Sequence, residues 1–131
     1  MNANPMEEQI GRLVGNLLAG GGGIFLPGVG SLYTERQGAR RLNRRTVLPP
    51  SRTVAFTSQQ RGVSLVDEIA RVMREAGGYE NPEAEAQAVY DRWIARVHRA
   101  DLLTVEGVGE LKFKNFIPDE AFDLRLNPQG R

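Results

Sequence analysis

The sequence of 131 residues contains no cysteine, one histidine, and no apolar run that could cross a membrane. Without cysteine, disulfide bridges and thiolate metal sites are excluded. A spanning helix needs about 20 consecutive apolar residues, and no stretch of the sequence approaches that length. The N-terminus also lacks the basic and then apolar pattern of a secretory signal peptide. These absences argue against a disulfide-stapled scaffold, and they predict a cytoplasmic location with no membrane segment in this chain.

Residues suited to catalysis are also scarce. The single histidine, His98, lies in a segment rich in packing residues, and the local sequence pairs no nucleophile with a base. Glu80, Glu83 and Glu85 gather where a helix is expected to begin, so stabilisation by the helix dipole explains them better than metal binding. The glycine run 20–23 follows a helical pattern and no Gly-Lys-Ser/Thr comes after it, which favours a helix end over a phosphate loop. We therefore expect no enzyme, no cofactor and no metal site.

The charge of the chain is distributed unevenly. Seven arginines against a single acid, Glu35, give residues 31–61 a net charge of +6, and the total of +1 leaves −5 for the rest. Such a basic strip favours a polyanionic partner, whereas arginines that protect a strand edge or pair with acids are the plain alternative. The candidate phosphate contacts lie within 17 positions that contain no acid: Arg36, Arg40, Arg41, Arg44, Arg45 and Arg52.

A short phrase occurs twice in the chain. Residues 28–32 read Gly-Val-Gly-Ser-Leu, and residues 107–111, 79 positions later, read Gly-Val-Gly-Glu-Leu. The apolar positions of a preceding helix repeat at the same offset, with Ile10, Val14 and Leu18 in the first copy and Val89, Trp93 and Val97 in the second. Because a whole helix-to-strand unit recurs, we divide the chain into two related modules, residues 1–61 and residues 62–131.

Three helices are expected, over residues 4–19, 64–76 and 81–100. Asn4 is the expected cap of the first helix and Asn81 that of the third, since an asparagine side chain accepts hydrogen bonds from free N–H groups at a helix start. Ser64 and Asp67 resemble a capping box for the second helix, with the shorter acid.

Strands are expected over residues 24–34, 52–57, 102–114 and 121–126. Pro27, Gly28 and Gly30 place a bend or bulge inside the first of them. The first two strands and the polar stretch between them read as one extended hairpin, which is longer and more basic than the hairpin of the second module. Trp93 and Phe113 are expected in the core. The fold class is therefore α+β, with helices packed on β-hairpin arms.

The order of these segments resembles the HU/IHF family of bacterial nucleoid proteins. In the second module, residues 102–109 look like the family's strand leading into its Gly-Phe-Gly signature, with valine in the middle. In the first module, residues 26–32 match the same signature, residues 38–41 resemble the base of the DNA-gripping arm, and residues 48–56 its returning strand. A closer likeness is to the tandem HU-like domains found ahead of peptidoglycan-binding SPOR domains in some bacterial envelope-associated proteins. The resemblance covers residues 6–127.

The resemblance implies two HU-like modules that form an intramolecular pseudo-dimer, with the first module lacking its first helix; a homodimer is the other arrangement. It implies a nucleoid location, or the cytoplasmic part of an envelope-associated protein. It also implies that the first hairpin binds DNA in the minor groove with low sequence specificity. The family's Arg-Asn-Pro tip is missing between Ala39 and Phe56, so strong DNA kinking is not implied. The alternative is a structural or adaptor module that binds protein and has lost strong DNA binding.

Overall fold

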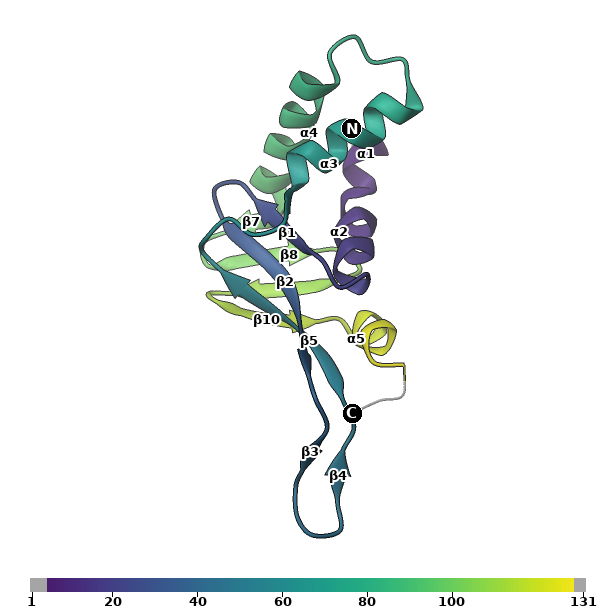
Figure 1. The fold of residues 1–131 in the computed structure, drawn as a ribbon. Helices are drawn as coiled ribbons and strands as arrows, with labels where there is room; N and C mark the ends of the chain where they lie inside the picture. The colour runs from purple at the N-terminus through teal and green to yellow at the C-terminus, as the bar shows by residue number, and fades with distance from the viewer. Residues whose placement is uncertain (1–4, 129–131) are drawn as a thin grey trace.

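The described residues form an α+β fold in which four helices gather at one end of two β-sheets and a long hairpin projects from the other end (Figure 1). The computed structural model describes residues 5–128, so the expected cap Asn4 and the terminal residues 129–131 lie outside the described part. No helix within that part is long and apolar enough to cross a membrane. The helices are α1 (Pro5–Glu8), α2 (Ile10–Ala19), α3 (Leu65–Ala76), α4 (Pro82–Val97) and α5 (Glu120–Leu126).

The strands form two four-stranded sheets and a two-stranded ribbon. The first sheet has the order β5-β2-β1-β6 and contains β1 (Gly23–Leu26), β2 (Gly30–Gln37), β5 (Ser51–Thr57) and β6 (Val63–Ser64). The second has the order β10-β9-β8-β7 and contains β7 (His98–Arg99), β8 (Leu102–Val105), β9 (Gly109–Lys112) and β10 (Asn115–Pro118). The ribbon pairs β3 (Arg40–Arg41) with β4 (Val47–Leu48). Because β6 pairs in parallel with β1, a strand that follows residue 61 completes the first sheet.

The helix ends follow the expectations in part. The Oδ1 of Asn81 accepts the N–H of Ala84 at 3.2 Å, so the expected cap of α4 is confirmed. Ser64 stands at the N-cap of α3, but its side chain makes no capping hydrogen bond, so the expected capping box with Asp67 is wrong. Gly77 follows the last residue of α3 with a φ of 78°, a left-handed conformation in which glycine is favoured.

The repeated Gly-Val-Gly phrase forms a tight turn between two antiparallel strands. We expected one strand over residues 24–34, with a bend or bulge inside it, and one strand over residues 102–114. Both predictions are wrong, since β1 reverses into β2 and β8 reverses into β9. The two turns share a register, because Leu26 pairs with Gly30 and Val105 pairs with Gly109. The first glycine of each phrase has a positive φ, 84° in one copy and 79° in the other, which explains the need for glycine there. The sequence repeat is thus also a structural repeat.

The two copies contact each other reciprocally. The hydroxyl of Tyr90 in α4 donates a hydrogen bond of 2.6 Å to the carbonyl of Pro27, in the turn of the first copy. At the 79-residue offset these positions correspond to Gly11 in α2 and Glu106 in the turn of the second copy. There the helix lies so close to the turn that a Cβ on Gly11 would collide with the carbonyl oxygen of Glu106. The helix of each copy therefore packs on the turn of the other, as in a twofold-symmetric dimer.

One hydrophobic core joins both copies. Trp93 is only 3% exposed and lies beside Tyr90, with 6.0 Å between the ring centroids, so its expected core position is confirmed. The core draws on helices and on both four-stranded sheets, and its members include Ile10, Val14, Leu18, Ile24, Leu32, Ile69, Met73, Val89, Leu103, Leu111 and Phe122. Phe113 is 71% exposed in the turn between β9 and β10, so the expectation that it lies in the core is wrong.

The end of the second module is a helix instead of the expected return strand over residues 121–126. The apolar residues at 122, 124 and 126 alternate with polar ones, a pattern that a strand also shows. Only Phe122 and Leu126 are buried, however, whereas Leu124 is 55% exposed. A spacing of four residues is that of one helix face, which is how α5 packs. The return strand is β10, which pairs with β9 directly after a two-residue turn.

Candidate nucleic-acid interface

The basic strip lies on the projecting hairpin. β2 and β5 extend beyond the sheet and are continued by the β3–β4 ribbon; we call residues 35–52 the arm (Figure 1). Every side chain from residue 35 to residue 47 is exposed. The extended hairpin expected from the sequence is therefore present, and it offers a long exposed surface to a partner.

The arm ends in a turn that Asn43 organises. The Oδ1 of Asn43 accepts the N–H groups of Arg45 and Thr46, at 2.8 and 2.9 Å. The guanidinium of Arg41 donates to the carbonyl of Arg44 at 3.2 Å. Asparagine favours such turns because its side chain replaces a backbone hydrogen-bond partner. The arginines of the tip are thus carried by an ordered turn.

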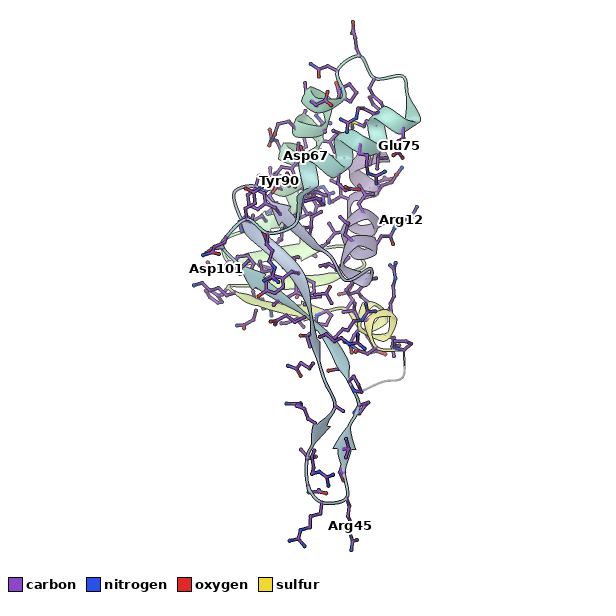
Figure 2. The ribbon with its side chains drawn as sticks, viewed as in Figure 1. Arg12, Arg45, Asp67, Glu75, Tyr90 and Asp101 are labelled. Carbon is purple, nitrogen blue, oxygen red and sulfur yellow. The ribbon has the colours of Figure 1, made fainter. Side chains whose placement is uncertain are left out.

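Five of the six expected contact residues lie on the exposed part of the arm: Arg36, Arg40, Arg41, Arg44 and Arg45. Figure 2 shows Arg45 at the far end of the arm, pointing away from the body. Within residues 5–128, arginine forms ion pairs at Arg71, Arg74 and Arg96, and none of these pairs involves the arm. Pairing with the acidic remainder of the chain therefore does not account for the arm's charge.

Arg52, the sixth expected contact, lies in a different environment at the base of the arm. Its Nε donates to the carbonyl of Leu126 at 3.0 Å, and its Nη1 donates to the carbonyl of Ala19 at 2.8 Å. These are the last residues of α5 and α2, where carbonyls lack helical partners and the dipole favours a cation. This geometry favours a structural role for Arg52 over the expected phosphate contact.

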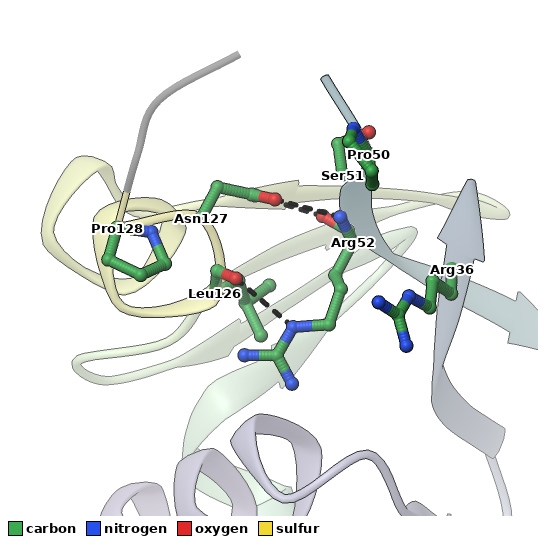
Figure 3. A pocket seen from close by; sticks show the side chains of 7 residues that line it. All are labelled: Arg36, Pro50, Ser51, Arg52, Leu126, Asn127 and Pro128. Atoms are coloured by element: carbon green, nitrogen blue, oxygen red, sulfur yellow. Dashed lines mark hydrogen bonds between the residues drawn. The ribbon is translucent and has the colours of Figure 1, made fainter. Parts of the chain in front are cut away.

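Asn127 binds the backbone of Arg52 through its side chain. The N–H of Arg52 donates to the Oδ1 of Asn127 at 2.8 Å, and the Nδ2 of Asn127 donates to the carbonyl of Arg52 at 3.0 Å (Figure 3). The amide group thus pairs with the free edge of β5 as a neighbouring strand would. Sequence reasoning missed this role because Asn127 lies 75 positions from Arg52, and nothing in the local sequence marks a partner at that distance.

A cleft of about 430 Å³ opens beside this contact (Figure 3). Its lining includes Arg36 and Arg52, which stand opposite each other in the β2–β5 register. Like charges at directly opposed positions repel, and the described residues provide no ion pair for either guanidinium. The basic surface therefore continues from the arm to its base.

Some cations outside the arm have partners within the described residues. The guanidinium of Arg61 lies 3.8 Å from the ring centroid of Tyr33, a cation–π contact. On the helices, Arg71 pairs with Glu68 at 2.5 Å and with Glu75 at 2.8 Å. The arm differs from the rest of the described surface in that five arginines without ion pairs lie close together on one projecting hairpin.

The described residues provide no group of three or more histidine, aspartate or glutamate side chains that could hold a metal ion. Burial raises the pKa of the Tyr90 hydroxyl above its ordinary value, and the hydrogen bond to Pro27 gives this group a structural use. His98 is half-buried where α4 passes into β7.

Comparison with known proteins adds no family to these observations. No protein-family model matches the chain, and a search of curated proteins finds no match to it.

Proposed function

We propose that this protein binds duplex DNA with low sequence specificity through the arm. The observation that carries the proposal is the set of five exposed arginines, without ion pairs among the described residues, on a projecting hairpin. Guanidinium groups bind phosphates through paired N–H donors, and these contacts carry little sequence information. Arginine also suits the narrow minor groove, whose negative potential attracts it. The proposal includes no catalytic role and no cofactor.

In the same proposal the chain is a pseudo-dimer of two HU-like modules and acts at the nucleoid, either free in the cytoplasm or as the cytoplasmic part of an envelope-associated protein. The shared register of the two turns and the reciprocal packing of each helix on the opposite turn support this arrangement. The modules differ where the proposed function requires it. In the first module, β2 and β5 are joined through the arm. In the second module, a turn of two residues joins β9 to β10.

The test is a DNA gel shift over a salt series, with a variant in which Arg40, Arg41, Arg44 and Arg45 are all alanine. We expect binding of the natural chain to weaken steeply with salt, because each neutralised phosphate adds about 0.9 to the slope of log affinity against log salt. The four-alanine variant should bind weakly and with a shallower slope. The absence of a shift at low salt, or an unchanged variant, would contradict DNA binding.

A charge-matched control separates the arm from net charge. Arg12, Arg92, Arg99 and Lys112 are exposed and lie outside the arm. Changing these four residues to alanine removes the same total charge, and we expect this variant to keep most of the affinity and the slope. Equal losses in the two variants would indicate general electrostatic attraction without an arm-specific site.

One observation favours the adaptor alternative. Phe113 is 71% exposed and has a φ of 56°, a left-handed conformation that is unfavourable for a bulky residue. A strained and exposed aromatic side chain is typical of a contact with another protein. The partner that sedimentation tests directly is a second copy of the chain. If concentration-dependent association is found and Phe113→Ser abolishes it, the adaptor role is favoured.

A further inference from the structure

The base of the arm is tied to two helices that lie far apart in the sequence. The guanidinium of Arg52 bridges the C-terminal carbonyls of α2 and α5, at Ala19 and Leu126. The side chain of Asn127 pairs with the backbone of Arg52 through two hydrogen bonds. We call these four hydrogen bonds the clasp; Figure 3 shows Arg52 with its partners Leu126 and Asn127. They join the arm of the first module to the last helix of the second.

The clasp is built to resist movement. Asn127 is 6% exposed, and Arg52 is half-buried. A guanidinium presents its donors in a fixed planar fork, so two carbonyls that bind Nε and Nη1 restrict its orientation. A buried amide that satisfies both its donor and its acceptor is costly to displace, because the separated groups would need new partners.

Beyond the clasp, the arm has little to hold it. Residues 35–47 are exposed, and β5 is the edge strand of its sheet. The direction of the arm relative to the body therefore depends on the β2–β5 pairing that continues into the sheet and on the contacts at the base of the arm. A rigid direction favours binding, since a ligand does not then have to order the arm.

We propose that Arg52 and Asn127 are positioning residues that fix the direction of the arm, and that α5 thereby controls DNA binding by the first module. This inference rests on the proposed function only where DNA is the readout. It assigns Arg52 a role through hydrogen bonds to carbonyls instead of through a phosphate.

Binding measurements distinguish the two roles of Arg52. For a positioning residue, Arg52→Gln and Arg52→Lys both lower DNA affinity, by about tenfold, because lysine lacks the fork. The salt slope stays that of the natural chain in both variants. For a phosphate contact, Arg52→Lys would keep the affinity and Arg52→Gln would reduce the slope by about 0.9, which would overturn the proposal.

A second measurement needs no DNA. The sequence has no cysteine, so in the double variant Ala39→Cys, Ala95→Cys a thiol-reactive spin label attaches only to these two positions, one on the arm and one on α4. Both positions are exposed. We expect a narrow distance distribution by pulsed EPR, and a broad or shifted one after Asn127→Ala. An unchanged distribution would overturn the proposal even if DNA binding were established, and a broadened one would support it even if DNA binding failed.

The matched control is Asn16→Ala. The Oδ1 of Asn16 accepts from Arg125 at 2.7 Å, an exposed hydrogen bond between α2 and α5 that does not reach the arm. We expect this variant to keep the narrow distribution and the DNA affinity. Urea unfolding of all variants checks that each one is folded when it is measured. Broadening in Asn16→Ala equal to that in Asn127→Ala would indicate general loosening of α5 and would overturn the specific role of the clasp.

Discussion

Gly11 and Tyr90 occupy equivalent positions in the two copies, yet they solve the same packing problem in opposite ways. Each faces the carbonyl at the start of the opposite turn. Tyr90 satisfies that carbonyl with its hydroxyl, whereas Gly11 removes its side chain so that the backbone can approach. At the level of single residues, the two copies therefore share this contact but differ in its chemistry.

Gly11→Ala tests the close approach. In an exposed helix position, alanine in place of glycine stabilises a protein by roughly 0.5–1 kcal/mol. At Gly11 we expect the opposite, a loss of about 1–3 kcal/mol, because the added methyl group collides with the carbonyl of Glu106. Gly15→Ala is the control, since its Cβ would lie 3.3 Å from a methyl group of Val108, a side chain that can shift. Urea unfolding followed by tryptophan fluorescence gives both values, and a more stable Gly11→Ala would contradict the reciprocal packing.

Tyr90→Phe tests the other half of the interface. Losing the hydroxyl leaves the carbonyl of Pro27 without this donor, and we expect a loss of about 1–2 kcal/mol at pH 7. Burial raises the pKa of Tyr90 above the ordinary value of about 10, so the folded state keeps a proton that the unfolded state releases. Its contribution is complete below pH 10 and declines as the pH rises further. The difference between the natural chain and Tyr90→Phe should shrink between pH 7 and pH 11; a constant difference would place the hydroxyl in water.

The two modules share one strand–turn–strand element but differ in the hairpin that follows it. Both begin with the same turn and register. In the first, β2 and β5 continue until their side chains leave the core, and in the second, β9 turns back at once into β10. The arm is therefore an addition to a hairpin that is complete without it.

Removal of the arm tests this view. Gln37 and Ser51 are paired across β2 and β5, so a two-residue Asn-Gly turn can replace residues 38–50 and join them directly. We expect the unfolding free energy to change by less than about 0.5 kcal/mol, because residues 38–47, 49 and 50 of the removed segment are exposed. DNA binding in the gel shift should be lost. Retained binding would place the DNA contact on the body, and a large loss of stability would show that the arm supports the fold.

The sequence predicted those elements that depend on local signals. The Asn81 cap, the glycine end of α3 and the buried Trp93 are of this kind. The errors have physical causes. Alternation at residues 122–126 fits a strand as well as a short helix, and only tertiary burial decides between them. The sequence of a single strand likewise does not show which strand it pairs with, so each Gly-Val-Gly phrase fits the interior of one long strand as well as a turn between two.

The candidate site, too, could be predicted from the sequence only in part. The arginine cluster was visible as composition, and five of its members lie together on the exposed arm. The separate role of Arg52 was not visible, because its partners Ala19, Leu126 and Asn127 come from two other elements. Charge alone cannot distinguish a guanidinium that awaits a ligand from one that already binds carbonyls.

At the scale of the whole molecule, the modules are not independent domains. One core draws on both copies, and β6 and α3 follow directly from the first sheet. The reciprocal contacts place each helix against the other copy. Such an interface is part of the folding unit, unlike the polar contacts between separately folded domains.

Cooperative unfolding tests this unity. We expect a single urea transition in which tryptophan fluorescence, which reports on the second module through Trp93, coincides with far-UV circular dichroism, which reports on both. Residues 1–61 and 62–131 expressed as separate chains should each remain unfolded, because each exposes the surface that the other covers. Mixed together they should form a one-to-one complex whose stability rises with concentration, as binding to the folded state requires. Cooperative unfolding of either fragment alone would show that this fragment folds by itself, and the chain would then consist of two domains in contact.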